Sequence, residues 1–374
     1  MNTITEHDIY NYWLCGCCNL NYNKLTGVLE YFKHPGEVFR ASGKALEDMK
    51  AKCREKGINI TDRDVAAIDS SRNWNVIRKN MQYLNERGIK YITVLDEAYP
   101  YKLRHIYDPP VILYCKGIPF PENKKSIAVI GARNCSPYGR EIGRYLAASI
   151  AKEGIIVLSG LARGVDSYAH MGALSVGGCT YAVLGCGIDI CYPPENINLY
   201  MEIQDKGGII SEYGPGIKPL SYHFPMRNRI ISALSDGILV VEAGEKSGSL
   251  ITVDMGLDQG KNIYAVPGRI TDKLSMGCNN LIKMGAKAVT SPADVLEDFF
   301  EYYSTDESGQ HTMKGNLNKE EKTVYEILDM TPKHIEEIAE LSNIPISRLM
   351  EHLLSLELKD LIRQSTKNYY IKNM

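Results

Sequence analysis

A series of short, fully apolar runs between residues 126 and 290 constrains the fold more than any other feature of this sequence. The runs are IAVIG, GIIVLSG, TYAVLGCG, GIISEY, GILVVEA, NIYAVPG and KAVT, and helical stretches lie between them. Strands that are apolar throughout are buried on both faces. Such strands, alternating with amphipathic helices, predict an α/β fold with an open, doubly wound, mostly parallel sheet. Ligands of these sheets bind at the carboxyl ends of the strands, where loops enter helices.

The rest of the chain divides around this segment. Residues 1–78 carry apolar residues at helical spacing and predict a helical domain, and residues 79–300 contain the sheet. Residues 301–318 are polar and mix Ser, Thr, Asp and Gly, which is typical of a linker. Residues 319–374 predict three amphipathic helices followed by a β-hairpin, the order of elements in a winged helix.

Composition and charge narrow the class of protein. No apolar run approaches the ~20 residues needed to cross a bilayer, and the first residues, MNTITEHDIYNYW, lack the pattern of a signal peptide. We therefore expect a cytoplasmic protein without a membrane partner, whose ten cysteines are free thiols. The C-x-x-C spacing of Cys15 and Cys18 has no second pair of ligands, so no metal site is expected. The net charge of −2 requires any nucleic-acid site to be a local basic patch.

The turn after the first apolar run has the residues of an anion site. Gly131 lets the backbone come close to a ligand, Arg133 offers a planar fork of donors, and the next helix offers N–H groups. The turn is not G-x-G-x-x-G and no acidic residue follows to bind a ribose, so no dinucleotide cofactor is expected. The second run ends in Ser159 and Gly160, which suit a phosphate with a hydroxyl and a backbone amide.

Asp166 and His170 follow this second turn at i, i+4 spacing. The spacing allows an acid–base pair. We prefer a structural interpretation, in which Asp166 lies at the start of a helix and pairs with His170.

Two further turns add polar groups at the same predicted edge. Arg227, Asn228 and Arg229 lie in the first turns of a predicted helix, where cations are unfavourable against its dipole unless an anion is near. The alternative is a pair of structural arginine–carboxylate bridges. The second turn resembles a phosphate loop without the register of an NTPase, and consists of Lys246, Ser247, Gly248 and Ser249. Several such turns along one edge suit a chain of phosphates, and no catalytic set accompanies them, so no catalytic residue is expected.

These strand-end sequences resemble those of the DprA (Smf) family of bacterial DNA-processing proteins. The shared motifs cover roughly residues 88–290 and include VIGAR, LSGLARGVDSYAH, HFP.RNRIISALSD and VVEA..KSGSLIT. A weaker resemblance extends to a sterile-alpha-motif-like N-terminal domain and a winged-helix-like C-terminal domain. The resemblance implies an extended Rossmann-like domain in a non-enzymatic protein that needs no cofactor. It also implies a homodimer that binds and protects single-stranded DNA and loads the RecA recombinase during natural transformation or recombination.

The resemblance also implies which residues bind DNA. It assigns phosphate binding to Gly131, Arg133, Ser159, Gly160, Arg227, Asn228, Arg229, Lys246, Ser247, Gly248 and Ser249. One departure is the absence of a lysine that family members commonly have a few residues after Tyr192-Pro193, and Arg163 is the candidate that compensates for it. Tyr138 and Phe224 are candidates for stacking on bases.

An enzyme is the main rival interpretation. Related Rossmann-like folds include nucleotide-binding hydrolases of the phosphoribohydrolase type, whose equivalent loop carries a glutamate that does the chemistry. The loop here, EAGEKSGSLIT, has no glutamate after the turn, which argues against hydrolysis. A winged-helix transcription regulator would explain the C-terminal residues alone and leave the large central domain without a role.

Overall fold

The computed structural model describes residues 5–299, 318–329, 331–359 and 361–372. The chain forms two compact units, Met1–Glu301 and Tyr302–Met374. The linker expected over residues 301–318 lies outside the described residues, apart from Asn318. None of the described helices is both long enough and apolar enough to span a bilayer.

The first unit begins with a group of helices that pack around the buried side chains of Trp13, Leu46 and Met49. Thr5 and Thr61 each start a helix with a capping box, in which the threonine and a following aspartate satisfy each other's backbone amides. The elements are α1 (Glu6–Tyr12), the π-helical turn η1 (Trp13–Cys17), α2 (Tyr22–Phe32), α3 (Pro35–Arg40), α4 (Gly43–Glu55), α5 (Asp62–Ser70) and α6 (Trp74–Glu86). Because α6 continues to Glu86, the helical region extends beyond the boundary expected at residue 78.

A nine-stranded sheet follows in the described part of this unit, in the order β1-β2-β6-β5-β4-β3-β7-β8-β9. The strands are β1 (Lys90–Thr93), β2 (Ile112–Gly117), β3 (Ser126–Ile130), β4 (Ile156–Ser159), β5 (Thr180–Leu184), β6 (Gly208–Ser211), β7 (Gly237–Val240), β8 (Asn262–Ala265) and β9 (Lys287–Ala288). Strands β3 to β9 pair in parallel, and β1 and β2 add an antiparallel edge. Every residue of β3 to β7 is buried. The predicted doubly wound, mostly parallel sheet is therefore confirmed, with each apolar run forming a strand.

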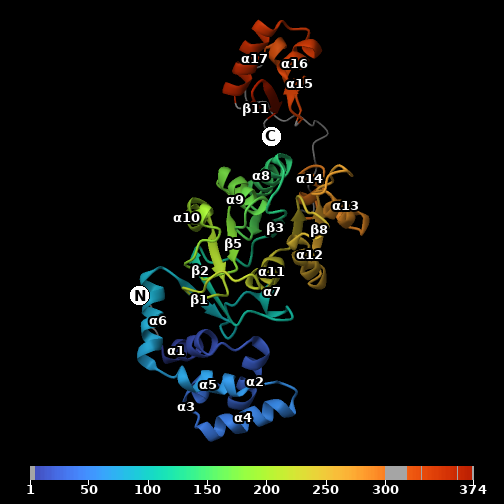
Figure 1. Ribbon diagram of the computed structural model, residues 1–374. Helices are drawn as coiled ribbons and strands as arrows, with labels where there is room; N and C mark the ends of the chain where they lie inside the picture. Colours follow the sequence, from blue (N-terminus) through green and yellow to red (C-terminus); the bar gives the residue numbers. More distant parts are fainter. Residues whose placement is uncertain (1–4, 300–317, 330, 360, 373–374) are drawn as a thin grey trace. The chain divides into compact units, whose positions relative to one another are not determined.

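Helices cover both faces of this sheet (Figure 1). They are α7 (Tyr101–Arg104), α8 (Pro137–Lys152), α9 (Val165–Ser175), η2 (Pro194–Asn196), α10 (Ile197–Lys206), α11 (His223–Leu234), α12 (Gly248–Asp258), α13 (Met276–Lys283) and α14 (Ala293–Leu296). Helices α8, α9 and α10 pack side by side, and α11 packs against α12. The chain runs outward from β3 to β6 and then returns to β7 on the other side of β3. The loops after β3 and β7 consequently diverge at this switch point and leave a crevice between them.

The second unit is a winged helix, as predicted. Its elements are α15 (Lys319–Ile327), β10 (Lys333–His334), α16 (Ile335–Ser342), α17 (Ile346–Leu358), β11 (Ile362–Thr366) and β12 (Tyr369–Lys372). The strands form a small antiparallel sheet in the order β10-β12-β11. The helices pack around a separate core that includes Val324, Ile338 and Leu353.

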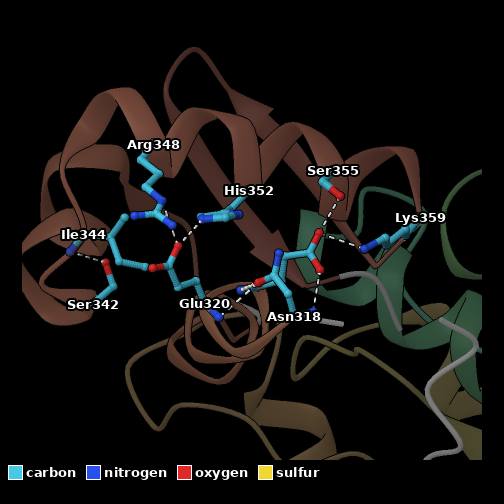
Figure 2. A network of polar contacts seen from close by, with 9 residues as sticks. Asn318, Glu320, Ser342, Ile344, Arg348, His352, Ser355 and Lys359 are labelled. Carbon is cyan, nitrogen blue, oxygen red and sulfur yellow. Dashed lines mark hydrogen bonds and ion pairs between the residues drawn. The ribbon is translucent and has the colours of Figure 1, made fainter. Parts of the chain in front are cut away.

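Adjacent glutamates on α15 tie this helix to α17 (Figure 2). Glu320 lies 2.8 Å from His352 Nε2 and 3.0 Å from Arg348 Nε. Glu321 is buried and accepts hydrogen bonds from Ser355 (2.5 Å) and Lys359 (2.7 Å). The two carboxylates therefore hold α15 against α17.

Candidate functional site

A pocket of about 550 Å³ opens at the switch point of the sheet. Polar groups of the loop after β3, the loop after β7 and the helix α11 line it. Among the predicted site residues, the pocket brings together Gly131, Arg133, Arg227, Asn228, Lys246, Ser247, Gly248 and Ser249. Ser159, Gly160, Arg163 and Arg229 do not line it.

Two cations lie at the exposed rim of this pocket. Arg133 and Lys246 are both exposed, and neither forms an ion pair with any residue that the structure describes. The Arg133 guanidinium lies 5.4 Å from the centre of the Phe224 ring, which in turn packs 5.5 Å from the ring of Tyr192. The rim thus places unpaired positive charge directly beside an aromatic pair.

A third cation forms part of the pocket floor. Arg227 is 4% exposed, and its guanidinium donates to the carbonyl oxygens of Gly160 (2.8 Å) and Val183. Burial lowers the pKa of Arg227 to about 10, while the nearby Asp166 carboxylate opposes that shift. Arg227 therefore keeps its charge at neutral pH and adds a positive field beneath the two exposed cations.

The turn after β4 is directed inward, contrary to expectation. The Ser159 hydroxyl donates to the carbonyl of Val129 (2.7 Å), and the Gly160 amide donates to the Asp166 carboxylate (3.0 Å). Both groups that were expected to meet a phosphate are therefore satisfied within the protein. The Gly160 amide holds Asp166 and the Gly160 carbonyl accepts from Arg227, so this turn supports the floor of the pocket.

Asp166 and His170 do not form the pair that their spacing allows. Burial raises the pKa of Asp166, against the opposing effect of Arg227 and of backbone amides. His170 is fully buried with Nδ1 2.7 Å from Thr180 Oγ1, and burial lowers its pKa to about 3. The histidine is thus neutral and bound to a threonine, so each residue has a structural role with its own partner.

The start of α8 is not available to an anion either. The Glu242 carboxylate, from the loop after β7, accepts hydrogen bonds from the backbone amide (2.8 Å) and hydroxyl (2.5 Å) of Ser136. A Cβ atom at Gly139 would lie 2.2 Å from this same carboxylate. A protein carboxylate therefore occupies the helix N-terminus that was expected to receive a phosphate. By contrast, the first turn of α12 lines the pocket with Ser247, Gly248 and Ser249.

The other two predicted arginines are paired with carboxylates. Arg229 is buried on another side of α11 and contacts Glu212 at 2.7 Å and Asp108 at 3.5 Å, so the arginine–carboxylate alternative describes this residue. Arg163 is exposed but pairs with Glu195, which follows the Tyr192-Pro193 segment. The cation expected to replace the missing lysine therefore faces a negative charge.

Two segments of this chain match known protein families. Residues 90–300 match the family described as DNA recombination-mediator protein A, and residues 313–366 match the DprA winged helix domain. This chain belongs to the DprA family. The match over residues 90–300 contains every residue that lines the switch-point pocket. The resemblance seen in the sequence motifs is therefore confirmed.

Individual DprA and Smf proteins align over most of this chain. The DNA processing protein DprA of Streptococcus pneumoniae is 39% identical over 279 residues, which are 70% of this chain and 97% of that protein. Protein Smf of Escherichia coli is 35% identical over 290 residues, or 75% of this chain and 77% of Smf.

Solved DprA structures also resemble this one. The X-ray structure of S. pneumoniae DprA aligns with a TM-score of 0.65 and 36% identity, covering 80% of this chain and all of that chain. DprA of Helicobacter pylori, whose structure concerns its single-stranded DNA binding mode, aligns with a TM-score of 0.52 and 31% identity. That alignment covers 57% of this chain and 96% of the H. pylori chain.

Two features of this DprA family site were missed in the sequence. Glu242, which accepts hydrogen bonds from the N-cap residue Ser136 of α8, could have been found from its place at the end of the apolar run GILVVEA and from Ser136-Pro137 at a helix start. Tyr192, which contacts Phe224, had no local signal because Tyr192 lies in the segment before η2 and Phe224 lies in α11. Of the two predicted aromatics, Phe224 lines the pocket and Tyr138 does not.

Proposed function

We propose that this protein binds single-stranded DNA in the switch-point pocket, protects it and loads the RecA recombinase onto it, without catalysing a reaction. The observation that carries this proposal is the pair of exposed cations, Arg133 and Lys246, above the buried charge of Arg227. In a chain of net charge −2, such a local concentration of unpaired positive charge favours a polyanion. The single-stranded DNA binding named for the H. pylori relative supports the same ligand.

The surroundings of Arg133 favour a single strand over a duplex. Its guanidinium is suited to a phosphate, while Phe224 and Tyr192 beside it offer ring faces for bases. Bases in a duplex are stacked on each other and cannot reach such rings. The shared lining of cations and aromatic rings therefore fits a flexible strand with unstacked bases.

The test is a salt-dependent binding titration with single-stranded and double-stranded oligonucleotides of equal length. We expect tight, sequence-tolerant binding of the single strand. Arg133→Ala is expected to weaken binding to every sequence and to reduce the slope of log K against log salt by about 0.7 for each lost phosphate contact. Arg144→Ala, which removes an exposed arginine of α8 outside the pocket lining, is the matched control and should leave the slope unchanged.

Two results would contradict the proposal. An unchanged salt slope in Arg133→Ala would remove this residue from the site. A wild-type protein that binds neither oligonucleotide at low salt would overturn the DNA-binding function, and release of base from nucleoside monophosphates should then be measured, as expected for a hydrolase.

The remaining parts of the proposal concern the assembly. We propose a homodimer formed through the Rossmann-like domain, with residues 301–318 acting as a linker to the winged helix. Sedimentation equilibrium measures the oligomeric state, and a monomer at micromolar concentration would contradict the dimer. RecA loading predicts that the protein accelerates the single-strand-dependent ATPase of RecA on DNA covered by a single-strand-binding protein, and no acceleration would contradict it.

A further inference from the structure

A second cleft, of about 1060 Å³, lies between the helical region and the sheet within the first unit. Figure 1 shows the helical region beside the β1–β2 edge of the sheet. The cleft is lined by residues of η1 and α6, by the loop after β6 and by the start of α11. None of the sequence motifs predicted it, because its walls come from segments that are far apart along the chain.

The walls of this cleft are rich in aromatic side chains. Tyr22, Tyr83, Tyr213 and Tyr222 line it above the buried rings of Tyr12 and Tyr114. Tyr222 is 62% exposed although it is a large ring in a concave site. Such exposed rings offer faces on which a planar group can stack.

The charges in the cleft do not suit a phosphate. Arg229 lies between two carboxylates, Glu212 at 2.7 Å and Asp108 at 3.5 Å, so this group has net negative charge. The buried atoms Arg229 Nε and His223 Nδ1 have no hydrogen-bond partner within the described residues. Because unpaired buried polar atoms are unfavourable, the cleft suits a neutral planar ligand that carries hydrogen-bond donors and acceptors. A nucleobase has this chemistry.

The two cavities share one helix. The first turns of α11 contribute Phe224 and Arg227 to the switch-point pocket, and contribute His223 and Arg229 to the second cleft. Both cavities also lie at the edge of the sheet formed by the carboxyl ends of its parallel strands, since Glu212 directly follows β6. A strand that leaves the pocket across the start of α11 therefore meets the second cleft next.

We propose that the second cleft receives unstacked bases of the same DNA strand whose phosphates occupy the switch-point pocket. This inference rests on the proposed function. It adds the second cleft, as a base-binding surface, to the Phe224 and Tyr192 rings that lie beside the phosphate-binding Arg133. It also gives a physical basis for discrimination against duplex DNA, because paired bases cannot enter an aromatic cleft.

The test compares an oligothymidylate with an abasic oligonucleotide of the same length, at fixed salt. The abasic strand keeps the phosphates and lacks the bases. Tyr222→Ala is expected to weaken binding of the oligothymidylate about ten-fold, as for the loss of one stacked base, and to leave abasic binding unchanged. Arg133→Ala is expected to weaken binding of both strands. Tyr101→Ala, which removes a 67% exposed tyrosine that lines neither cavity, is the matched control.

The outcomes separate the two proposals. Wild-type affinity of Tyr222→Ala for the oligothymidylate, or an equal loss for both strands, would overturn base binding in the second cleft. Tyr83→Ala provides an independent variant on α6, another of the elements that line the cleft, and should show the same selective loss. A wild-type protein that binds neither strand would instead overturn the proposed DNA-binding function itself.

Discussion

At the scale of single residues, Gly160 connects the fold to the candidate site. Its amide donates to Asp166 and its carbonyl accepts from the buried Arg227. A Cβ atom at this position would lie 2.5 Å from the Arg227 guanidinium. Because a buried charge is stable only when its partners are in place, the small size of this residue is part of what keeps Arg227 beneath the pocket.

We predict that Gly160→Ala lowers the free energy of unfolding by about 1–3 kcal/mol, the range for overpacking a tightly packed interior. The added methyl group must displace the guanidinium or the backbone that holds it. Urea titration measures the change, with Gly43→Ala as control, since a Cβ atom at Gly43 meets nothing within 4 Å. Equal stability of Gly160→Ala and the wild type would show that the Arg227 site tolerates displacement.

At the scale of elements, the contact of α15 with α17 depends on ionised carboxylates. Burial alone raises the pKa of Glu321, but hydrogen bonds from Lys359, Ser355 and the Asn318 amide outweigh it and lower the pKa to about 2. Because the folded-state pKa is below the ordinary value of 4.5, the ionised carboxylate stabilises the fold above about pH 4.5. This contribution is lost as the pH falls through about 2.

We therefore predict that Glu321→Gln lowers the melting temperature of the winged helix at pH 6. The difference in melting temperature between variant and wild type should become smaller as the pH falls to 3. The amide cannot ionise and so lacks the pH-dependent contribution. Scanning calorimetry of the full chain at both pH values measures the difference. Glu326→Gln, which changes an exposed glutamate of the same helix, should have little effect at either pH. A constant difference would contradict the ionic origin of the contact.

At the scale of the whole molecule, the helical region and the sheet share one hydrophobic core, although the sequence predicts them as separate domains. One continuous core runs from Ile9 in the helical region to Cys278 in α13, and it includes β1–β2 edge residues such as Ile112. The winged helix has its own core around Leu349 and Leu353. The helical region and the sheet are thus expected to unfold together, and the winged helix separately.

Calorimetry of the full chain should accordingly show two transitions. Leu353→Ala, in the winged-helix core, is expected to lower the melting temperature of one transition, and Ile77→Ala, in α6, that of the other. The physical reason is that each buried side chain stabilises only the core in which it packs. A third transition that responds to Ile77→Ala alone would show that the helical region is an independent domain.

The sequence by itself determined the parallel sheet and the winged helix. Runs such as IAVIG are apolar on both faces, and this local pattern is enough to bury a strand inside a layered fold. The turns that line the pocket could also be identified from the sequence, because ligands of such sheets bind at the carboxyl ends of the strands. Arg133 and Lys246 were consequently predicted, and the structure brings both to one pocket.

Only the tertiary structure decided which polar groups face outward. Arg163 and Arg229 were predicted to bind phosphate together with Arg133, but the folded chain places Glu195 and Glu212 against them. The second cleft likewise forms where the helical region meets the sheet. The physical reason is that ion pairs and cavities depend on contacts between segments far apart in the chain, whereas the burial of a strand follows from its own residues.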